Sequence, residues 1–320
     1  MDAKNQTFIT EFILLEITAV RQLQIVSFVF LLALYLFNLI GNVGIITLVI
    51  KDLHLHTPMY FFLGKLSFLD VFFSSTTVPK MLSSLLTGDN RISLCSCIVQ
   101  LYFYHFVGCT EALLLTTMSY DRYLAICTPL HYNAIMTKRT YIFLATNCWV
   151  ISFIYSLIHP LLASKLPFCR DNHIKHFFCD IKPLLKLSCD ETKLNEKLVF
   201  IVTGLVAFTT FSLILVSYVL ISARLLNIHS TQDRRKAFST CTSHLIVFSL
   251  YYGSGFCTYL TPAEKESLPQ DRLAAVLVTF IIPALNPLIY SLRNRDVKRS
   301  LQRMFSNSHV FRERTMETFK

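Results

Sequence analysis

Long apolar segments separated by short polar loops recur along the whole chain. Each is about as long as, or longer than, the roughly 20 residues with which an α-helix crosses the hydrocarbon core of a bilayer. The pattern predicts seven membrane-spanning helices, at about 25–50, 58–83, 93–126, 141–163, 198–223, 237–260 and 273–292. No internal repeat or second set of elements interrupts it, so we expect one all-α membrane domain, a seven-helix bundle over residues 1–320.

The segment at 93–126 is almost wholly apolar, yet it carries polar groups at three depths. Cys97 lies near its start, Glu111 near its middle, and the charged pair Asp121 and Arg122 at its end. A charge within hydrocarbon is expensive, so Glu111 should face the interior of the bundle. We therefore expect this span at the centre, with the other spans around it.

The composition indicates the class of protein, and the distribution of charge predicts how the chain is oriented in the membrane. Apolar residues make up 53% of the chain and charged residues 16%, which is typical of membrane proteins. The segments 51–57, 121–140, 222–238 and 291–320 hold 16 Lys and Arg against 6 Asp and Glu, and the rest of the chain is neutral. Basic loops stay in the cytoplasm, so the N-terminus is expected outside and the C-terminus inside. A nucleic-acid binder would not place its charges between apolar spans, so no nucleic-acid partner is expected.

The two ends of the chain carry local signals. Residues 1–24 lack the basic region and cleavage site of a signal peptide. Asn5 begins an N-x-T tripeptide, which is a glycosylation acceptor if this end lies outside. Beyond the last span, Val297, Leu301 and Phe305 recur at a spacing of four among basic residues. This spacing predicts a short amphipathic helix on the inner leaflet, with membrane lipid as a partner.

The chain has ten cysteines, and several fall in segments expected outside, where disulfides persist. Cys97 lies at the mouth of the third span and Cys179 in the long outer loop, so a bond between them would pin that loop over the bundle. Cys169 and Cys189 could then close a local loop. Four cysteines allow three pairings, so spacing leaves the connectivity open, with Cys95 left over.

The outer loop also contains the spacing of a metal site, formed by Cys169, His173, His176 and Cys179. An oxidising compartment favours disulfides over a metal centre. We therefore expect no metal and no cofactor.

Asp70 and Glu111 are acids at mid-membrane depth. One interpretation is a paired interior site for Na⁺, water or a proton that differs between two states of the protein. The alternative is that each acid is a hydrogen-bonded packing residue. Intramembrane acids are functional by default, which favours the first interpretation.

Two further motifs lie at the inner ends of spans. Asp121, Arg122 and Tyr123 form either a switch, in which Arg122 is released to a cytoplasmic partner, or a plain interface anchor. In the seventh span, Pro287 removes a helix hydrogen bond and frees a carbonyl that Asn286 could satisfy, while Tyr290 could move between two packings. The alternative is a static kink, which spacing alone favours.

A face of small and polar residues runs along the outer half of the third span. Its members share helical spacing, and they are His105, Gly108, Cys109 and Ala112. The sixth span repeats the pattern with Tyr252, Gly255, Phe256 and Tyr259. Small residues leave room for a ligand, but they also allow two helices to pack closely, so spacing leaves both readings open.

The chain contains none of the sequence signatures of catalysis that we searched for. It has no G-x-S-x-G, no H-E-x-x-H, no phosphate-binding loop and no dinucleotide fingerprint. We therefore expect a protein that is not an enzyme.

Six motifs, taken together and in this order, resemble the olfactory receptors, a branch of the rhodopsin-like (class A) G-protein-coupled receptors. They are NQTFITEFILL at 5–15, PMYFFLGKLSFLDVFFSSTTVPKML at 58–82, MSYDRYLAIC at 118–127, HFFCD at 176–180, KAFSTCTSHL at 236–245 and PALNPLIYSLRN at 283–294. The short outer loops are similar to those of the tetrapod-type class. The chain departs from the usual family pattern at Gly64 and Lys65, and Lys65 would have to snorkel or pair.

The resemblance implies roles for particular residues. It implies disulfides Cys97–Cys179 and Cys169–Cys189, and an interior ion or water site at Asp70 and Glu111. It implies a G-protein switch formed by Asp121, Arg122, Tyr123, Tyr218, Asn286, Pro287 and Tyr290. It implies odorant contacts at His105, Gly108, Cys109, Ala112, Val202, Val206, Tyr252, Gly255, Tyr259 and Thr279.

The function that follows from the resemblance is that of an odorant receptor. Small, mostly apolar volatiles would bind in the outer half of the bundle and activate a stimulatory or olfactory Gα, raising cyclic AMP. The expected location is the plasma membrane, in the cilia of olfactory sensory neurons, reached with the help of trafficking chaperones. Alternatives are a receptor for a non-odorant small metabolite in another tissue and a transporter or channel, which would need a polar path or broken helices in matching halves.

Overall fold

The computed structural model describes residues 9–18, 20–168, 171–228, 230–259, 275–293 and 296–304. Its longer helices are α1 (Arg21–Lys51), α2 (Pro58–Thr87), α3 (Leu94–Cys127), α5 (Lys138–Ser156), α8 (Lys193–Leu226), α9 (Thr231–Tyr259) and α11 (Ile282–Arg293). Shorter elements are η1 (Leu53–Leu55), α4 (Pro129–Ile135), α6 (Ile158–Ser164), α7 (Ile181–Lys186), η2 (Leu277–Ile281), β1 (Glu11–Leu14), β2 (Arg91–Ser93) and β3 (His173–Ile174).

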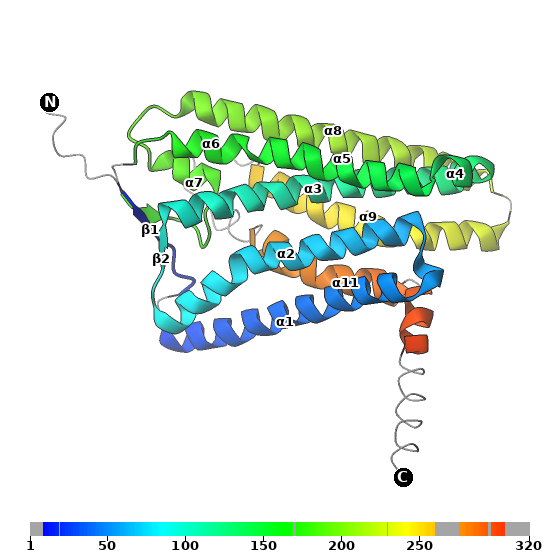
Figure 1. Cartoon of the computed structure of the whole chain (residues 1–320), viewed down its shortest axis with the longest axis horizontal. Helices are drawn as coiled ribbons and strands as arrows, with labels where there is room; N and C mark the ends of the chain where they lie inside the picture. Colours follow the sequence, from blue (N-terminus) through cyan, green and yellow to red (C-terminus); the bar gives the residue numbers. More distant parts are fainter. Residues whose placement is uncertain are drawn as a thin grey trace, which may run out of the picture.

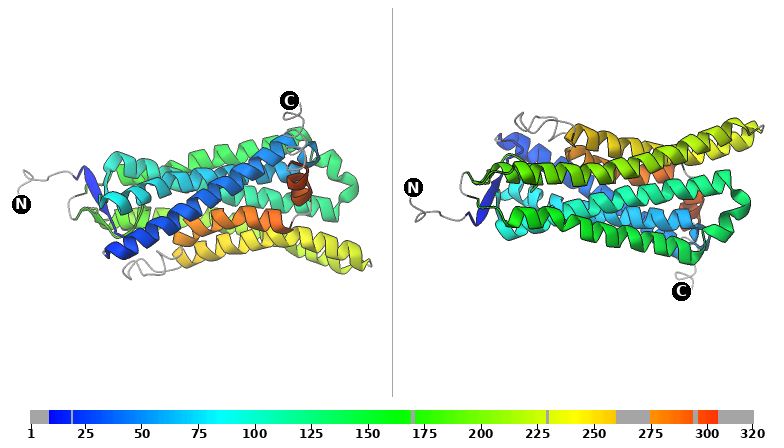
Figure 2. Two further views of the ribbon diagram at one scale, coloured as in Figure 1. Left: turned by 90° about the horizontal axis from the view of Figure 1, so that it is seen from below. Right: turned by 90° about the horizontal axis from the view of Figure 1, so that it is seen from above.

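The helical passes of the described residues run side by side along the long axis of the molecule (Figures 1 and 2). They are α1, α2, α3, α5 with α6, α8, α9, and η2 with α11. The strands and α7 lie at one end of the bundle, while α4 and the helix at 296–304 lie at the other. Five of the described helical segments are long and apolar enough to cross a membrane, and Leu277–Tyr290 is a shorter apolar helix. This arrangement confirms the predicted all-α seven-helix fold.

The third pass, α3, is the central helix of the bundle. It contacts α2, α5, α6, α8 and α9, and in its apolar stretch 61% of the residues are buried, against 11% in α1. The Ser93 side chain accepts a hydrogen bond from the Ser96 N–H at 3.1 Å, which satisfies one of the free donors at the start of the helix. A mostly apolar helix buried on several sides is what the pattern at 93–126 predicts.

Proline accounts for two interruptions of the passes. The predicted span at 141–163 is two helices, α5 and α6, which separate at Leu157. Pro160 has no N–H to donate to the carbonyl of Ser156, one turn earlier, so the helix breaks there. In the seventh pass, Pro283 lacks the N–H that would bond to Thr279, and the backbone around Thr279 is a π-helical segment, η2.

A three-stranded sheet closes the end of the bundle that holds α7, and the sequence analysis did not predict it. β1 lies in the middle, antiparallel to β2 and parallel to β3. Phe12 of β1 is fully buried and packs edge-to-face on Phe168, with 5.2 Å between the ring centroids. The N-terminal segment is thereby attached to the loop between α6 and α8, residues 165–192, which we call the lid.

The helix at 296–304 packs against the opposite end of the bundle. Val297 is buried there, and Leu301 is partly buried against the same core. The Tyr60 hydroxyl donates to Asp296 Oδ2 at 3.0 Å, and Arg303 Nη2 donates to Asp52 Oδ2 at 2.9 Å. Phe305, the third apolar position of the predicted amphipathic helix, lies outside the described residues.

Candidate functional site: a bundle interior with a pinned end and a polar switch

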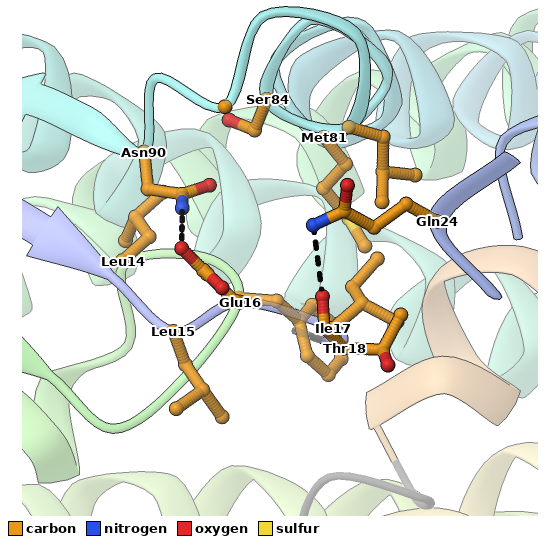
Figure 3. A pocket seen from close by; sticks show the side chains of 12 residues that line it. Leu14, Leu15, Glu16, Ile17, Thr18, Gln24, Met81, Ser84 and Asn90 are labelled. Carbon is orange, nitrogen blue, oxygen red and sulfur yellow. Dashed lines mark hydrogen bonds between the residues drawn. The ribbon is translucent and has the colours of Figure 1, made fainter. Parts of the chain in front are cut away.

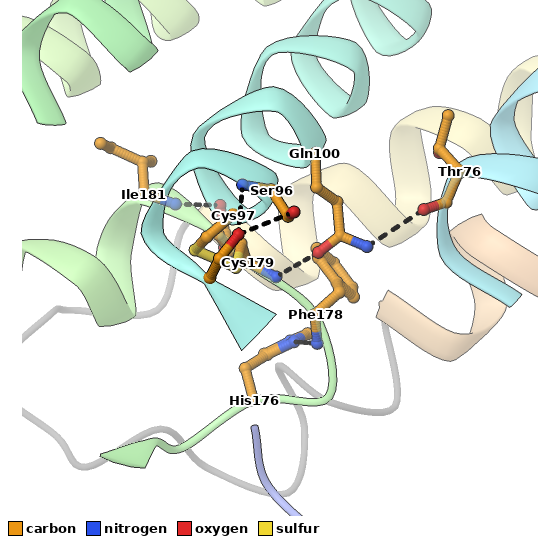
Figure 4. The surroundings of a disulfide bond; sticks show 10 residues. Thr76, Ser96, Cys97, Gln100, His176, Phe178, Cys179 and Ile181 are labelled. Carbon is orange, nitrogen blue, oxygen red and sulfur yellow. Dashed lines mark hydrogen bonds between the residues drawn. A yellow bond between two sulfur atoms is a disulfide. The ribbon is translucent and has the colours of Figure 1, made fainter. Parts of the chain in front are cut away.

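The lid is bound to the outer end of α3 by a disulfide between Cys97 and Cys179, with an S–S distance of 2.06 Å (Figure 4). Cys189 also takes part in a disulfide. Its expected partner, Cys169, lies outside the described residues, so that pairing stays a prediction. Cys95 is exposed and free.

Gln100 reinforces the attachment of the lid one turn below the disulfide. Its Oε1 accepts a hydrogen bond from the Cys179 N–H at 2.9 Å, and its Nε2 donates to the Thr76 carbonyl at 3.1 Å. Figure 4 shows this side chain between α2 and the lid. Beside it, Phe178 is buried against Tyr104 of α3, with ring centroids 4.9 Å apart. The lid is therefore bound covalently, by hydrogen bonds and by a buried ring.

A small cleft lies where the N-terminal segment meets α1 and α2 (Figure 3). Asn90 Nδ2 donates to Glu16 Oε1 at 3.2 Å, and Gln24 Nε2 donates to the Thr18 carbonyl at 3.0 Å. The cavity volume is about 30 Å³, which is close to the volume of one water molecule. It is far smaller than the few hundred Å³ of a typical ligand pocket, so this cleft holds no odorant.

Two histidines form a stacked pair between α3 and α6. The rings of His105 and His159 lie 3.8 Å apart between centroids, and both residues are buried. His105 Nδ1 donates to the Leu101 carbonyl at 2.9 Å, because a carbonyl oxygen can only accept. In a neutral imidazole the other nitrogen, Nε2, is then an acceptor, and it has no partner among the described residues.

His159 also donates through one ring nitrogen and leaves the other without a partner, but the roles of Nδ1 and Nε2 are exchanged. The Tyr155 hydroxyl donates to Thr203 Oγ1 of α8 at 3.2 Å, so it is free only to accept from His159 Nε2, which lies 3.3 Å away. His159 Nδ1 is therefore an acceptor, again without a partner in the described part of the chain. The pair thus holds two unsatisfied acceptor nitrogens in the interior of the bundle.

The remaining residues of the predicted face on α3 contact different helices. Cys109 and Ala112 are buried, and Cys109 lies near Cys148 of α5. Gly108 instead faces α9, where its carbonyl accepts a hydrogen bond from the Tyr251 hydroxyl at 2.6 Å. The face therefore divides between α5 with α6 on one side and α9 on the other.

The other predicted contact residues lie on α8, α9 and η2. Val202 and Val206 of α8 and Gly255 of α9 are half-buried. The Tyr252 hydroxyl donates to Thr210 Oγ1 of α8 at 2.7 Å, and Thr279 is fully buried with its hydroxyl unpaired among the described residues. The side chain of Tyr259 lies outside the described part of the structure.

A polar cluster fills the middle of the bundle between α1, α2 and α11. Asn286 Nδ2 lies 3.1 and 2.9 Å from the two carboxylate oxygens of Asp70. Asn38 Nδ2 donates to the Asp70 carbonyl at 3.2 Å and to Ser74 Oγ at 2.6 Å. Asn42 Nδ2 donates to the Pro283 carbonyl at 3.1 Å, which is the group that Pro287 leaves without its helix partner. Asn286 was expected to be able to satisfy this carbonyl, and that prediction is wrong, because its amide bonds to Asp70 instead.

Close packing and an unpaired acid complete the cluster. A Cβ atom added at Gly41 would lie 2.9 Å from the Pro287 ring, so only glycine allows α1 to approach α11 this closely. Glu111 is buried on α3 and interacts electrostatically with Asp70. Its Oε1 accepts no hydrogen bond from the described residues, so this oxygen is available to a hydrogen-bond donor or to a cation.

The charged end of α3 is held by a three-residue contact. Arg122 Nη2 donates to Asp121 Oδ2 at 2.9 Å, and the Tyr132 hydroxyl of α4 donates to Asp121 Oδ1 at 2.8 Å. Burial raises the pKa of Tyr132, and the Asp121 carboxylate raises it further, so the phenol stays protonated and keeps donating. The Asp121 side chain is fully buried and that of Arg122 is 14% exposed, so the ion pair is largely shielded from solvent.

A second chain of hydrogen bonds joins α8, α9 and α3 nearly two helical turns farther from the inner end of α3. His244 Nε2 donates to the Leu115 carbonyl at 3.0 Å, so its Nδ1 accepts from the Tyr218 hydroxyl at 2.7 Å. Tyr290 is buried nearby, and its hydroxyl has no partner among the described residues. Tyr123 packs against the same core from the side.

The family of the chain follows from its similarity to known proteins. The family model described as "Olfactory receptor" matches residues 31–308. Olfactory receptor 12D1 of Homo sapiens is 47% identical over 93% of this chain and 94% of its own length. Olfactory receptor 1468 of Rattus norvegicus is 44% identical over 97% of this chain and 99% of its own length. The chain belongs to the olfactory receptor family.

The fold agrees with this assignment. The crystal structure of squid rhodopsin superposes with a TM-score of 0.72, covering 90% of this chain and 87% of its own, at 18% identity. At that identity the likeness concerns the fold alone, which is the seven-helix bundle of rhodopsin-like receptors.

Family membership confirms several predictions. This olfactory receptor is a multi-pass protein of the plasma membrane with odorants as ligands and a G protein as partner, and it is not an enzyme. The same finding favours a receptor over the transporter or channel that the two buried acids left open.

Sequence reasoning missed four residues that the structure brings into the site. Gln100 and His244 make hydrogen bonds between segments far apart in the chain, His159 stacks on the distant His105, and Tyr132 bonds to Asp121 on the preceding helix. The only sequence signal was a polar side chain at an otherwise buried helix position, which occurs at too many positions to single these out.

Proposed function

We propose that odorants bind in the outer half of the bundle, between α3, α6, α8 and α9. The observation that carries the proposal is the His105–His159 pair, which presents two acceptor nitrogens without partners in a buried, mostly apolar interior. A buried polar atom without a partner is destabilising until something satisfies it. The proposed lining residues are His105, Gly108, Cys109, Ala112, Val202, Val206, Tyr252, Gly255, Tyr259 and Thr279.

The hydrogen-bond roles of the pair narrow the ligand class. Both free nitrogens accept, so the best ligands are small, mostly apolar molecules that carry one hydrogen-bond donor, such as alcohols. An ether or ketone of the same size offers only acceptors to this site. It would leave both nitrogens unsatisfied and bind more weakly.

We propose a signalling route from this site to Arg122. Ligand binding shifts an existing equilibrium by its differential affinity for the active state. The inner ends of α8 and α9 then move apart, the Asp121–Arg122 contact opens, and Arg122 meets a stimulatory or olfactory Gα that raises cyclic AMP. Tyr123, Tyr218, Asn286, Pro287 and Tyr290 are the residues proposed to change contacts in this step.

Asp70 and Glu111 are proposed as an interior ion or water site. Two buried acids that interact electrostatically favour a bound Na⁺, or a shared proton, between them. The site lies between the ligand region and the inner end of α3, so its occupancy would differ between the two states. Replacement of Glu111 by Gln is expected to remove any effect of Na⁺ on basal signalling.

The disulfide supports a proposed orientation of the receptor in the membrane. A disulfide persists in an oxidising compartment, so we propose that the end with the lid faces outside. Glycosylation at Asn5, which lies outside the described residues, and a Cys169–Cys189 disulfide fit this orientation. Olfactory cilia are the proposed location, with trafficking chaperones and inner-leaflet lipid at the helix at 296–304 as further partners.

The direct test is a panel of matched odorants against a cyclic AMP reporter in cells that express the receptor. Among pairs that differ only as alcohol and methyl ether, alcohols should be about tenfold more potent, since one buried hydrogen bond contributes about 1.4 kcal/mol. The double variant His105→Phe with His159→Phe, which removes both acceptor nitrogens, should erase that preference, whereas His173→Ala, on the exposed lid, should keep it. Equal potency of alcohols and ethers would contradict the proposed ligand class, and silence to the whole panel at normal surface expression would contradict the function.

A further inference from the structure

A groove of about 550 Å³ lies between the outer halves of α2 and α3, under β2. Its volume is within the range of small-molecule sites. The residues that line it are Thr76, Lys80, Arg91, Ile92, Ser93, Cys95, Ser96, Val99, Gln100 and Phe103. None of them belongs to the proposed odorant contacts or to the switch.

The upper part of the groove is polar and positively charged. Lys80 and Arg91 line it, and the lining contains no acid. Arg91 is paired at 3.0 Å with Asp89, and Glu11 also lies near it, but neither acid faces the groove. Lys80 Nζ donates to the Asp89 backbone carbonyl at 3.1 Å and also interacts electrostatically with the Asp89 carboxylate, although in the described structure no carboxylate lies within salt-bridge distance of it.

The lower part of the groove continues into an aromatic wall that faces the lipid. Phe103 contacts Phe72 at 5.2 Å, Phe72 stacks on Phe68 at 6.3 Å, and Phe68 contacts Trp149 at 5.9 Å between centroids. Phe68 is 48% exposed at the surface of the bundle. Twelve residues separate Lys80 from Phe68, so the wall descends about 18 Å, slightly more than one leaflet of hydrocarbon.

We propose that this groove binds a long-chain fatty acid from the outer leaflet. The carboxylate lies between Lys80 and Arg91, and the alkyl chain runs past Val99 and Phe103 onto the aromatic wall. A cationic mouth above an apolar wall one leaflet long matches a single-chain anionic amphiphile in both charge and length. Anionic phospholipids are concentrated in the cytoplasmic leaflet, which makes them poor candidates at this end of the receptor.

The single tryptophan of the chain provides a direct readout, because Trp149 lies at the foot of the wall. The full-length receptor is placed in phosphatidylcholine vesicles that contain no other protein and titrated with hexadecanoic acid brominated near its terminal methyl group. Bound acid should quench Trp149 fluorescence saturably, and unbrominated hexadecanoic acid should reverse the quenching. The brominated methyl ester, which partitions into the bilayer without a charge, should quench only in proportion to its concentration.

Variants that remove a charge distinguish binding in the groove from partitioning into bulk lipid. Lys80→Gln should weaken saturable binding about fivefold, since a partly exposed ion pair contributes up to about 1 kcal/mol. Lys80→Arg should bind as the wild type does. Lys65→Gln removes a cation from the inner half of the same helix, where it lies 5.5 Å from the Phe61 ring, and should have no effect.

A second readout uses Cys95, an exposed and free thiol in the groove. Bound acid should slow maleimide labelling of the Cys95 peptide in the wild type and in Lys80→Arg, but much less in Lys80→Gln. Equal saturable binding of the ester, wild-type affinity in Lys80→Gln, or displacement of the acid by phosphatidylserine would each overturn the proposal. None of these results bears on the odorant site, which shares no residue with the groove.

Discussion

The two ends of α3 are held in different ways. At its outer end, Cys97 is bonded covalently to the lid, Gln100 joins the lid to α2, and the lid is attached to the N-terminal strand through the sheet. At its inner end, Asp121 and Arg122 are held by noncovalent contacts, to each other and to Tyr132. One helix is therefore cross-linked at one end and hydrogen-bonded at the other.

The difference shows how a single helix can serve as both a fixed frame and a switch. A disulfide that closes a long loop is unaffected by small changes in helix packing. Charge-assisted hydrogen bonds contribute about 1.5–3 kcal/mol each, which is within the range that a ligand's differential affinity can offset. Ligand binding near the cross-linked outer end of α3 can therefore change the noncovalent contacts at its inner end.

The largest expected effect comes from cutting the outer cross-link. Cys179→Ser opens a loop of 82 residues, which should lower the free energy of unfolding by about 4 kcal/mol. Thermal unfolding in nanodiscs and surface expression measure the loss. Cys95→Ser, which removes an exposed free thiol at the same end, is the matched control and should behave as the wild type. Equal stability of the two variants would show that the disulfide does not hold the lid.

The second-largest expected effect comes from breaking the ion pair at the inner end of α3. Asp121→Asn removes the carboxylate that holds Arg122, so basal cyclic AMP should rise, with the resting state losing about 2–3 kcal/mol. Stability should change little, because the outer cross-link remains. Asp190→Asn on the exposed lid should leave basal signalling unchanged. Unchanged basal signalling in Asp121→Asn, at normal surface expression, would argue that this contact does not restrain the receptor.

The smallest effect tests the noncovalent part of the outer end. Gln100→Leu leaves the Cys179 N–H and the Thr76 carbonyl without their partner, which should cost about 2 kcal/mol of stability. The melting temperature should fall by several degrees while basal cyclic AMP stays low. Gln22→Leu at the exposed start of α1 is the control. A rise in basal signalling in Gln100→Leu would contradict the separation between the two ends.

The helices and their central member could be predicted from the sequence, because apolar length and the depth of polar residues are local properties. Asp70, Glu111, Asp121 and Arg122 stand out for the same reason, since each is a charge in or beside an apolar segment. The pairing of Cys97 with Cys179 came from the family resemblance, because spacing alone allowed other pairings.

The contacts between distant segments could not be predicted. The sheet depends on three short strands from separate parts of the chain, and the His105–His159 stack depends on how α6 packs against α3. Asn42 reaches the Pro283 carbonyl across the bundle, where a nearer asparagine had been expected. Each of these requires the relative placement of helices, which hydropathy and spacing do not contain.

The most direct test of the account is hydrogen–deuterium exchange in the full-length receptor, with and without an activating odorant and its G protein. The outer turns of α3, residues 94–101, should exchange equally slowly in both states. The inner half of α9, residues 231–244, should exchange faster in the activated state as the contacts of His244 with Tyr218 and α3 open. Faster exchange at 94–101 with no change at 231–244 would contradict the account.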